Sequence, residues 1–231
     1  MMTGLVRKAT LLSVCGLLGA SVAMAGVPSA GNSVIGTGIN LVGTAGGVAD
    51  VKGQKLIVVK DAGGTPVQNS TVTINFSAST ASDIRLCSVQ PFSGVGVSCS
   101  NKEVVALTDA SGTATFRVVG FAVNAGGAVS PNPPAAGYGA GGATVKADGV
   151  LLGTLTVGAY DQNGTAGCSS VDLALVANDK FAFAWSGGGL PSLRGRSDFD
   201  SNNQITSVDL ALAATAKFAL GSTASCASAC P

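Results

Sequence analysis

Between about residues 48 and 160, short apolar segments alternate with turns rich in Gly, Asp and Asn. The segment 71–77 alternates most clearly, because Val72, Ile74 and Phe76 occupy every second position and therefore share one face. The other segments predicted as strands are 55–60, 84–88, 95–99, 104–107, 113–119, 143–147 and 150–157. The Gly- and Pro-rich stretch 120–142 is predicted to be a long loop. Short strands at this spacing predict a mainly β fold, built as a β-sandwich.

After residue 160 the spacing of the apolar positions changes from two to nearly four, which is typical of amphipathic helices. Residues 161–175 align without a gap on residues 198–212, and both copies continue to a Lys-Phe-Ala sequence. The offset between the copies is 37 residues throughout. The chain therefore carries an internal repeat in which a polar loop precedes each helix.

The first 25 residues have the features of a secretory signal peptide. Arg7 and Lys8 supply positive charge, residues 9–22 are uncharged and apolar, and Ala23 and Ala25 form the small-x-small cleavage pattern. The apolar run is shorter than the ~20 residues that a membrane-spanning helix needs. We therefore expect cleavage after Ala25, a secreted, extracellular or cell-surface protein, and no membrane span in the mature chain.

Composition narrows the function classes. The chain of 231 residues has only 11% charged residues, with 13 Lys and Arg against 12 Asp and Glu, and it has no His. This balance leaves no basic face for nucleic acid, and the lack of His removes Ser-His-Asp and Cys-His catalysis. Outside the repeat the mature chain has too few carboxylates for a supported acid–base pair, so we expect no enzyme activity. These carboxylates are Asp50, Asp61, Asp83, Glu103, Asp109, Asp148 and Asp179.

The cysteines left after removal of the signal peptide are Cys87, Cys99, Cys168, Cys226 and Cys230. Export to an oxidising compartment makes disulfides the expected state. Cys87 and Cys99 flank a short segment with Pro and Gly, which predicts a bridge between them across a hairpin or loop. The other three cannot all pair within one chain, which leaves a free thiol or an intermolecular bridge open.

The second copy of the repeat has the oxygen-ligand spacing of an EF-hand-type calcium loop. Asp198, Asp200 and Asn202 stand at positions 1, 3 and 5, Asp209 stands at position 12, and Gln204 at position 7 would offer its backbone carbonyl. A tight turn brings such alternating side chains to one centre, and a hard cation takes about six to eight oxygen ligands. This loop is therefore predicted to bind Ca²⁺.

The corresponding candidate ligands in the first copy are Asp161, Asn163, Thr165, Gly167 and Asp172. Position 6, where Gly normally allows a sharp turn, is Ala166 in this loop and Asn203 in the second. Asn adopts a positive φ more readily than Ala, so the second loop is predicted to bind calcium more tightly. The first loop is then either a weaker site or only a structural turn.

A simpler alternative is that the polar residues of both loops only cap the helices, with Ser170 and Ser207 as the capping residues. Against it, five of the 12 acidic residues of the chain lie within the two loops. Such a concentration in a chain this poor in charge favours calcium.

The paired loop-helix units, the Val-Asp-Leu that closes each loop and the constant offset resemble a type I dockerin over roughly residues 158–221. Dockerins are small calcium-binding modules that dock secreted proteins onto cohesin partners. The resemblance implies that positions 10 and 11 of each loop contact the partner. These positions are Ser170, Val171, Ser207 and Val208. The chain departs from the family pattern at Cys168, where the family has an aliphatic residue, and in the Gly- and Arg-rich connection 186–196.

Residues 58–73 resemble the strand-turn-strand opening of a bacterial immunoglobulin-like domain, and residues 108–116 resemble its T-D-x-x-G-x-A-x-F hairpin. Such domains act as spacers or adhesin modules in exported proteins. The expected organisation is a signal peptide (1–25), a Gly-rich segment (26–47), an immunoglobulin-like β-sandwich (48–158), a small α-helical dockerin-like module (159–221) and a Cys-containing tail (222–231).

These patterns predict a non-catalytic exported protein that uses Ca²⁺ to dock onto a cohesin-like or other cell-surface protein. The alternative is an adhesin or carbohydrate-binding sandwich with a calcium-stabilised tail. A glycan site usually presents exposed aromatic rings, and the candidates are Phe92, Tyr138 and Trp185. Packing at the end of a helix explains Trp185 more simply than glycan binding does.

Overall fold

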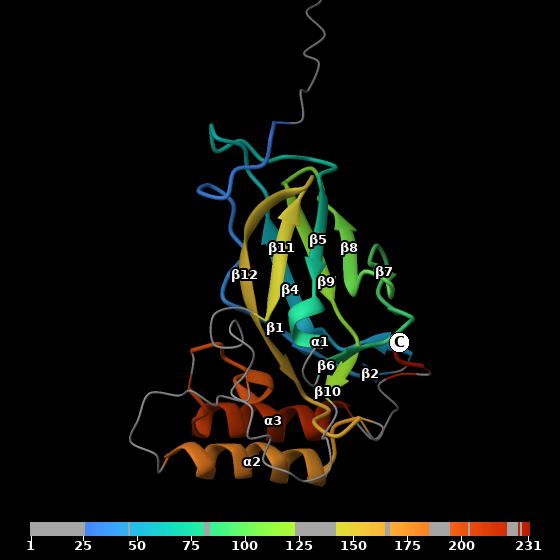
Figure 1. Cartoon of the computed structure of the whole chain (residues 1–231), viewed down its shortest axis with the longest axis vertical. Helices are drawn as coiled ribbons and strands as arrows, with labels where there is room; N and C mark the ends of the chain where they lie inside the picture. The colour runs from blue at the N-terminus through green and yellow to red at the C-terminus, as the bar shows by residue number, and fades with distance from the viewer. Residues whose placement is uncertain are drawn as a thin grey trace, which may run out of the picture.

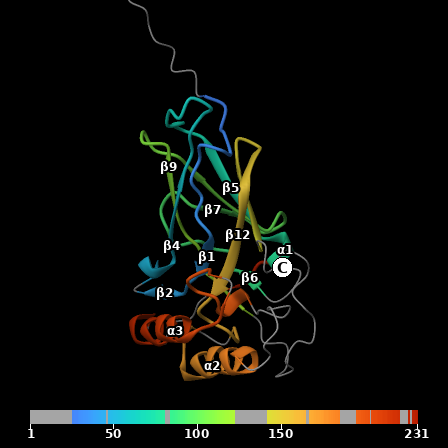
Figure 2. The same ribbon diagram turned by 90° about the vertical axis from the view of Figure 1, so that its left-hand side faces the viewer.

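The computed structural model describes residues 26–45, 47–80, 84–122, 142–164, 167–184, 195–202, 204–220, 226 and 228–231. The described part is mainly β, with the strands forming a tall body and two longer helices lying together beneath it (Figures 1 and 2). The strands are β1 (Gly38–Leu41), β2 (Thr44–Ala45), β3 (Val48–Ala49), β4 (Gln54–Val58), β5 (Thr71–Asn75), β6 (Ile84–Leu86), β7 (Gly96–Ser98), β8 (Glu103–Leu107), β9 (Thr113–Arg117), β10 (Gly120–Ala122), β11 (Ala143–Ala147) and β12 (Val150–Ala159). The helices are α1 (Ser77–Thr80), α2 (Ser170–Ala184) and α3 (Ser207–Leu220), with 3-10 turns η1 (Val51–Gly53) and η2 (Gly195–Ser197).

Every segment predicted as a strand contains one, and the largest sheet has six strands in the order β1-β12-β11-β5-β8-β7. All of its neighbours are antiparallel except β1 and β12, which run parallel with Asn40 opposite Gly158. Smaller pairs are formed by β4 with β9, β6 with β10, and β2 with β3. The Gly-rich segment 26–47 thus supplies β1, which was not predicted, and β10 occupies the start of the predicted loop 120–142.

One buried cluster joins residues of the six-stranded sheet with residues of the β4–β9 pair. The alternation predicted for 71–77 is confirmed, because Val72, Ile74 and Phe76 are all fully buried. Phe116 of β9 and Ile57 of β4 are fully buried in the same cluster. Burial of side chains of this size contributes about 1.5–3 kcal/mol each, so this shared core holds the strands together.

A buried hydroxyl ties the end of β8 to the start of β5. The Thr108 hydroxyl donates to the Val67 carbonyl at 2.6 Å and accepts from the Ser70 N–H at 2.8 Å. Only 2% of Thr108 is exposed, so water cannot replace either bond.

We therefore expect Thr108→Val to lower the free energy of unfolding by about 2–3 kcal/mol, because it leaves a donor and an acceptor buried and unpaired. Urea denaturation monitored by circular dichroism measures this change. Thr71→Val is the matched control, because Thr71 is exposed and its replacement should change stability by less than about 0.5 kcal/mol. Equal effects of the two substitutions would contradict the role of the buried hydroxyl.

The two predicted helices are confirmed as α2 and α3, which pack side by side (Figures 1 and 2). A second buried cluster lies between them and the lower end of the strands. Its members include Val42, Val119, Tyr160, Cys168, Val176, Phe199, Ala213 and Ala216. The helices therefore share a core with the strands and are not packed only on each other.

Both disulfides connect the strands to the end of the chain. Cys87 is bonded to Cys226 and Cys99 to Cys230, so the predicted bridge between Cys87 and Cys99 is wrong. The reason is that the tail returns along β6, where the Ser88 N–H donates to the Ser228 carbonyl and the Cys230 N–H to the Leu86 carbonyl. This pairing brings a tail cysteine to each predicted partner, with Cα–Cα distances of 5.3 and 5.0 Å. Cys168 is buried and belongs to neither bridge.

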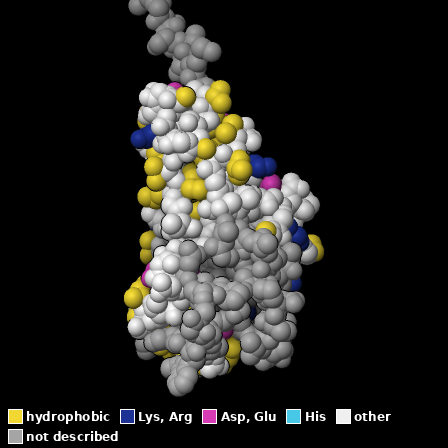
Figure 3. Space-filling view, turned by 60° about the vertical axis from the view of Figure 1, so that its left-hand side comes forward, with side chains coloured by type: hydrophobic (Ala, Val, Ile, Leu, Met, Phe, Trp, Pro, Cys, Tyr) yellow, Lys and Arg dark blue, Asp and Glu magenta, His cyan; other side chains and the backbone are white. Residues whose placement is uncertain are grey.

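The surface agrees with the low charge of the sequence. Among the described residues of the face in Figure 3, Lys and Arg side chains are scattered and form no broad basic patch. No helix within the described ranges is long and apolar enough to cross a bilayer. The predicted signal peptide (1–25), Tyr138 and Trp185 lie outside the described residues.

Candidate metal centre

Both repeat loops are held at the lower end of the strands. Strand β12 ends at Ala159 and runs through the buried Tyr160 directly into Asp161, the first residue of the first loop. The second loop begins at Asp198, directly after η2. Each loop leads into one of the two helices, so the repeat of the sequence is also a repeat of structure.

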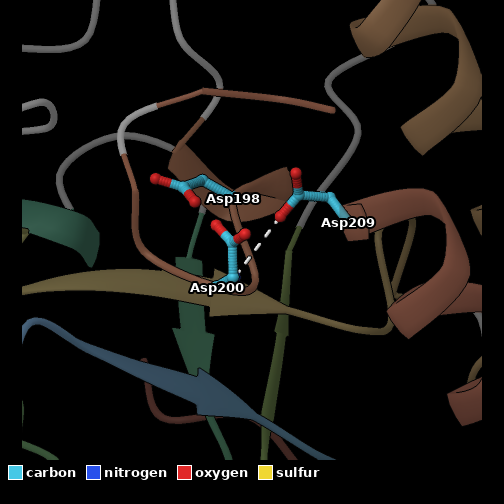
Figure 4. Close-up of side chains that lie close together, drawn as sticks. All are labelled: Asp198, Asp200 and Asp209. Atoms are coloured by element: carbon cyan, nitrogen blue, oxygen red, sulfur yellow. Dashed lines mark hydrogen bonds between the residues drawn. The ribbon is translucent and has the colours of Figure 1, made fainter. Parts of the chain in front are cut away.

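Three carboxylates of the second loop converge. Asp198, Asp200 and Asp209, called the carboxylate cluster below, each place one oxygen within 4.8 Å of the others (Figure 4). Asp198 and Asp209 are buried, with 2% and 0% of their surfaces exposed, whereas Asp200 is exposed. Hard oxygen donors from positions 1, 3 and 12 suit a hard divalent cation such as Ca²⁺. The predicted ligands of positions 1, 3 and 12 are thus brought together.

The fully buried carboxylate of Asp209 is held by backbone N–H groups. Its Oδ1 accepts from Phe199 N at 2.8 Å. The same oxygen accepts from Asp200 N at 3.3 Å, and Figure 4 draws this second bond. Its Oδ2 accepts from Thr206 N at 2.7 Å and from the Thr206 hydroxyl at 3.2 Å. These donors offset the cost of burying the charge and fix both oxygens in place.

The first loop repeats this arrangement. Asp172 Oδ1 accepts from Gln162 N at 2.7 Å, and its Oδ2 accepts from Ser169 N, also at 2.7 Å. Asp161 is buried as well, and its carboxylate accepts from the N–H groups of Gly164 and Gly167. The position-12 carboxylates of both loops therefore accept from the same two positions, 2 and 9.

The helix caps lie one residue before the predicted ones. The hydroxyl of Ser169 accepts from Val171 N at 3.2 Å, and that of Thr206 accepts from Val208 N at 3.1 Å. With Asp172 and Asp209 bonded back to Ser169 and Thr206, each helix starts with a capping box. Ser170 and Ser207 are thereby left exposed, so the prediction that they are the caps is wrong.

The remaining predicted ligands differ in how they take part. Asn202 donates from Nδ2 to Asp200 Oδ2 at 2.9 Å, and its Oδ1 accepts from Gln204 N at 2.8 Å. Gln204 is exposed and Asn163 is half-buried. Thr165 and the position-6 residues of both loops, Ala166 and Asn203, lie outside the described residues.

Within the described part of each loop, position 4 has the left-handed backbone conformation. These residues are Gly164 with a φ of 67° and Ser201 with a φ of 58°. The EF-hand-type spacing does not predict this conformation at position 4, although Gly164 in the first loop is a signal for it, because Gly adopts a positive φ without strain.

Two aromatic rings connect the loops. The ring of Phe199, at position 2 of the second loop, stacks on Tyr160 with ring centroids 4.6 Å apart and an interplanar angle of 12°. Burial raises the pKa of Tyr160 to about 12, so its phenol is neutral at physiological pH. Neither ring was predicted to belong to the site, because their contact joins residues far apart in sequence.

A buried polar network also holds the first loop to the segment before the second. The Gln162 side chain donates to the carbonyls of Ala159 and Arg196. The Ser197 hydroxyl donates to Asp179 of α2 at 2.6 Å, and Arg196 approaches the same carboxylate at 3.9 Å. The two loops are therefore part of one packed unit.

No protein-family model, no curated protein and no solved structure matches this chain. Function is therefore inferred from the geometry of the carboxylate cluster and its surroundings.

Proposed function

We propose that the chain is a non-catalytic, exported calcium-binding protein in which a dockerin-like module docks an immunoglobulin-like sandwich onto a partner. The observation that carries this proposal is the convergence of the carboxylate cluster, Asp198, Asp200 and Asp209, within 4.8 Å. Three like charges this close repel each other, and a divalent cation among them would relieve that repulsion. Asp198, Asp200 and Asp209 would hold the ion, with the Asn202 side chain and the Gln204 carbonyl at the remaining ligand positions.

Exposure of the residues at positions 10 and 11 supports the docking part of the proposal. Val171 and Val208 are 54% and 53% exposed, and Ser170 and Ser207 beside them are exposed too. The two copies thus present the same Ser-Val pair to solvent at the start of α2 and α3. A cohesin-like partner is the kind of protein that the family resemblance implies for these positions.

The alternative, a carbohydrate-binding or adhesive sandwich, gains no support from Phe92. The ring of Phe92 packs against the main core, and the Arg117 guanidinium lies over it at 4.8 Å from the ring centroid. A face covered in this way is not open for stacking on a sugar.

The test is a calcium titration of the full mature chain, followed by calorimetry and thermal melting. At a calcium concentration one hundredfold above the dissociation constant, each occupied site should raise the free energy of unfolding by about 2.7 kcal/mol. Asp198→Ala should remove the tighter binding step. Asp148→Ala should not, because Asp148 lies in the turn between β11 and β12, at the opposite end of β12 from the first loop. A wild-type chain without a calcium-dependent shift, or an equal shift in Asp198→Ala, would refute calcium binding.

The docking half is tested with the same immobilised chain in calcium and in chelator. A cohesin-like partner should bind in calcium and be released by chelator. Binding that survives chelation would contradict a calcium-dependent docking surface.

A further inference from the structure

We infer that Asn40, on strand β1 of the sandwich, is a positioning residue for the second loop, so that the metal centre extends beyond the repeat. This inference rests on the proposed calcium site. Asn40 lies 159 residues before Phe199 in the chain, yet its Nδ2 donates to the Phe199 carbonyl at 2.9 Å. This bond joins a side chain of the six-stranded sheet directly to the backbone of the second loop.

One peptide group transmits this contact to the carboxylate cluster. The carbonyl that Asn40 holds belongs to the peptide between Phe199 and Asp200, and the N–H of that peptide donates to Asp209 Oδ1 at 3.3 Å. The Phe199 N–H donates to the same oxygen at 2.8 Å. A bond at the carbonyl end of a peptide polarises the group and strengthens the bond at its N–H end. Asn40 therefore acts on the position of the Asp209 carboxylate through a single peptide.

The place of Asn40 is itself fixed by close packing. Its partner in the parallel pairing is Gly158, where a Cβ would overlap the Asn40 amide and approach the Phe199 ring to 3.2 Å. Gly38 lies on β1, as Asn40 does, and a Cβ at Gly38 would overlap the side chain of Ser201 in the second loop. The Tyr160 ring holds Phe199 by stacking on it. The second loop therefore packs closely against strands β1 and β12 at Gly38 and Gly158.

Residues that hold metal ligands in place typically change metal affinity by about 10–100-fold when they are removed. The effect of Asn40 on an ion would come through the Phe199–Asp200 peptide, whose carbonyl it holds and whose N–H donates to Asp209. A carboxylate in its place would accept hydrogen bonds but donate none, and it would face the Phe199 carbonyl with like polarity. It would also bring a negative charge closer to the ion.

Loss of the donated hydrogen bond should lower the calcium affinity, whereas the added negative charge should raise it. The affinity of Asn40→Asp therefore shows which of the two effects is larger. If Asn40 positions the loop, the variant should lose about tenfold or more in calcium affinity of the tighter step, measured by calorimetry on the full mature chain. If only charge near the site matters, the affinity should rise. Asn32→Asp is the matched control, because the Asn32 amide also donates to backbone carbonyls, in this case those of Asp61 and Ala62, both at 2.9 Å. Asn32 is bonded at the other end of the strands and should leave calcium affinity unchanged.

Thermal melting in chelator shows whether each variant folds. Should Asn40→Asp not fold, Asn40→Ala replaces it and is expected to lose about threefold to tenfold in affinity, with Asn32→Ala as its control. Unchanged or increased affinity in a folded Asn40 variant, or failure of both Asn40 variants to fold, would overturn the inference. A wild-type chain that binds no calcium would instead refute the proposed function, so the two failures are distinguishable.

Discussion

Replacing both Cys226 and Cys230 by Ser is expected to lower the free energy of unfolding by about 8 kcal/mol, which equals or exceeds the whole stability of many domains. The bridge from Cys87 to Cys226 spans 139 residues, and a ring of that size removes chain entropy worth about 5 kcal/mol from the unfolded state. Once it is closed, the bridge from Cys99 to Cys230 closes a ring of only about 18 residues, worth about 3 kcal/mol.

The contributions of the two bridges to the free energy of unfolding are therefore not expected to be additive. Either single substitution should cost only about 3 kcal/mol, because the remaining bridge still closes a long ring. Denaturation of the oxidised proteins measures these losses, and reduced wild type should match the double variant. Cys168→Ala is the control for loss of a thiol outside both bridges. A single substitution as costly as the double one, or peptide mapping that joins Cys87 to Cys99, would contradict the interlinked pairing.

Asp209→Ala is expected to have two separate effects. In chelator it should lower the free energy of unfolding by about 3–5 kcal/mol, because the backbone N–H groups of Phe199, Asp200 and Thr206 lose their acceptor inside the protein. In calcium it should also remove the tighter binding step, because position 12 would supply no oxygen. Urea denaturation in chelator measures the first effect, and calorimetry measures the second.

Asp200→Ala separates the two roles, because Asp200 belongs to the same cluster but is exposed. It should weaken calcium binding and change stability in chelator by less than about 0.5 kcal/mol. If Asp209→Ala were as stable in chelator as Asp200→Ala, the buried carboxylate would not be the cap that its hydrogen bonds indicate.

The strands and helices could be predicted wherever the pattern is local. Alternation marks β5, and four-residue spacing marks α2 and α3, because each element buries one face of its own. Strand β1 could not be predicted, because its two buried residues, Ile39 and Leu41, stand in a four-residue strand within a Gly-rich segment. Its position depends on pairing with β12, which a local pattern does not encode. The cysteine pairing could not be predicted for the same reason, because it depends on the course of the tail along β6.

The residues of the site differ in the same way, because some depend on local sequence and others on contacts between distant segments. The spacing of positions 1, 3 and 12 identified Asp198, Asp200 and Asp209, because the loop alone brings these residues together. The same spacing could not identify Asn40, which reaches the loop only through the packing of the strands. The caps were misplaced by one residue because each loop has two successive hydroxyl residues, Ser169-Ser170 and Thr206-Ser207. The N–H groups of Ser169 and Thr206 donate to Asp172 and Asp209, and these bonds identify the caps.

The return of the tail to the strands has a mechanical consequence. The paired loops and helices leave the strands through β12 and are bonded back to them covalently at Cys87 and Cys99. If a partner docks on the exposed starts of α2 and α3, as proposed, tension on that partner would enter the strand body at two separate places instead of through one flexible linker. One path runs along the hydrogen-bonded length of β12 and the other through covalent bonds. Such an attachment would keep a docked partner at a fixed orientation under load.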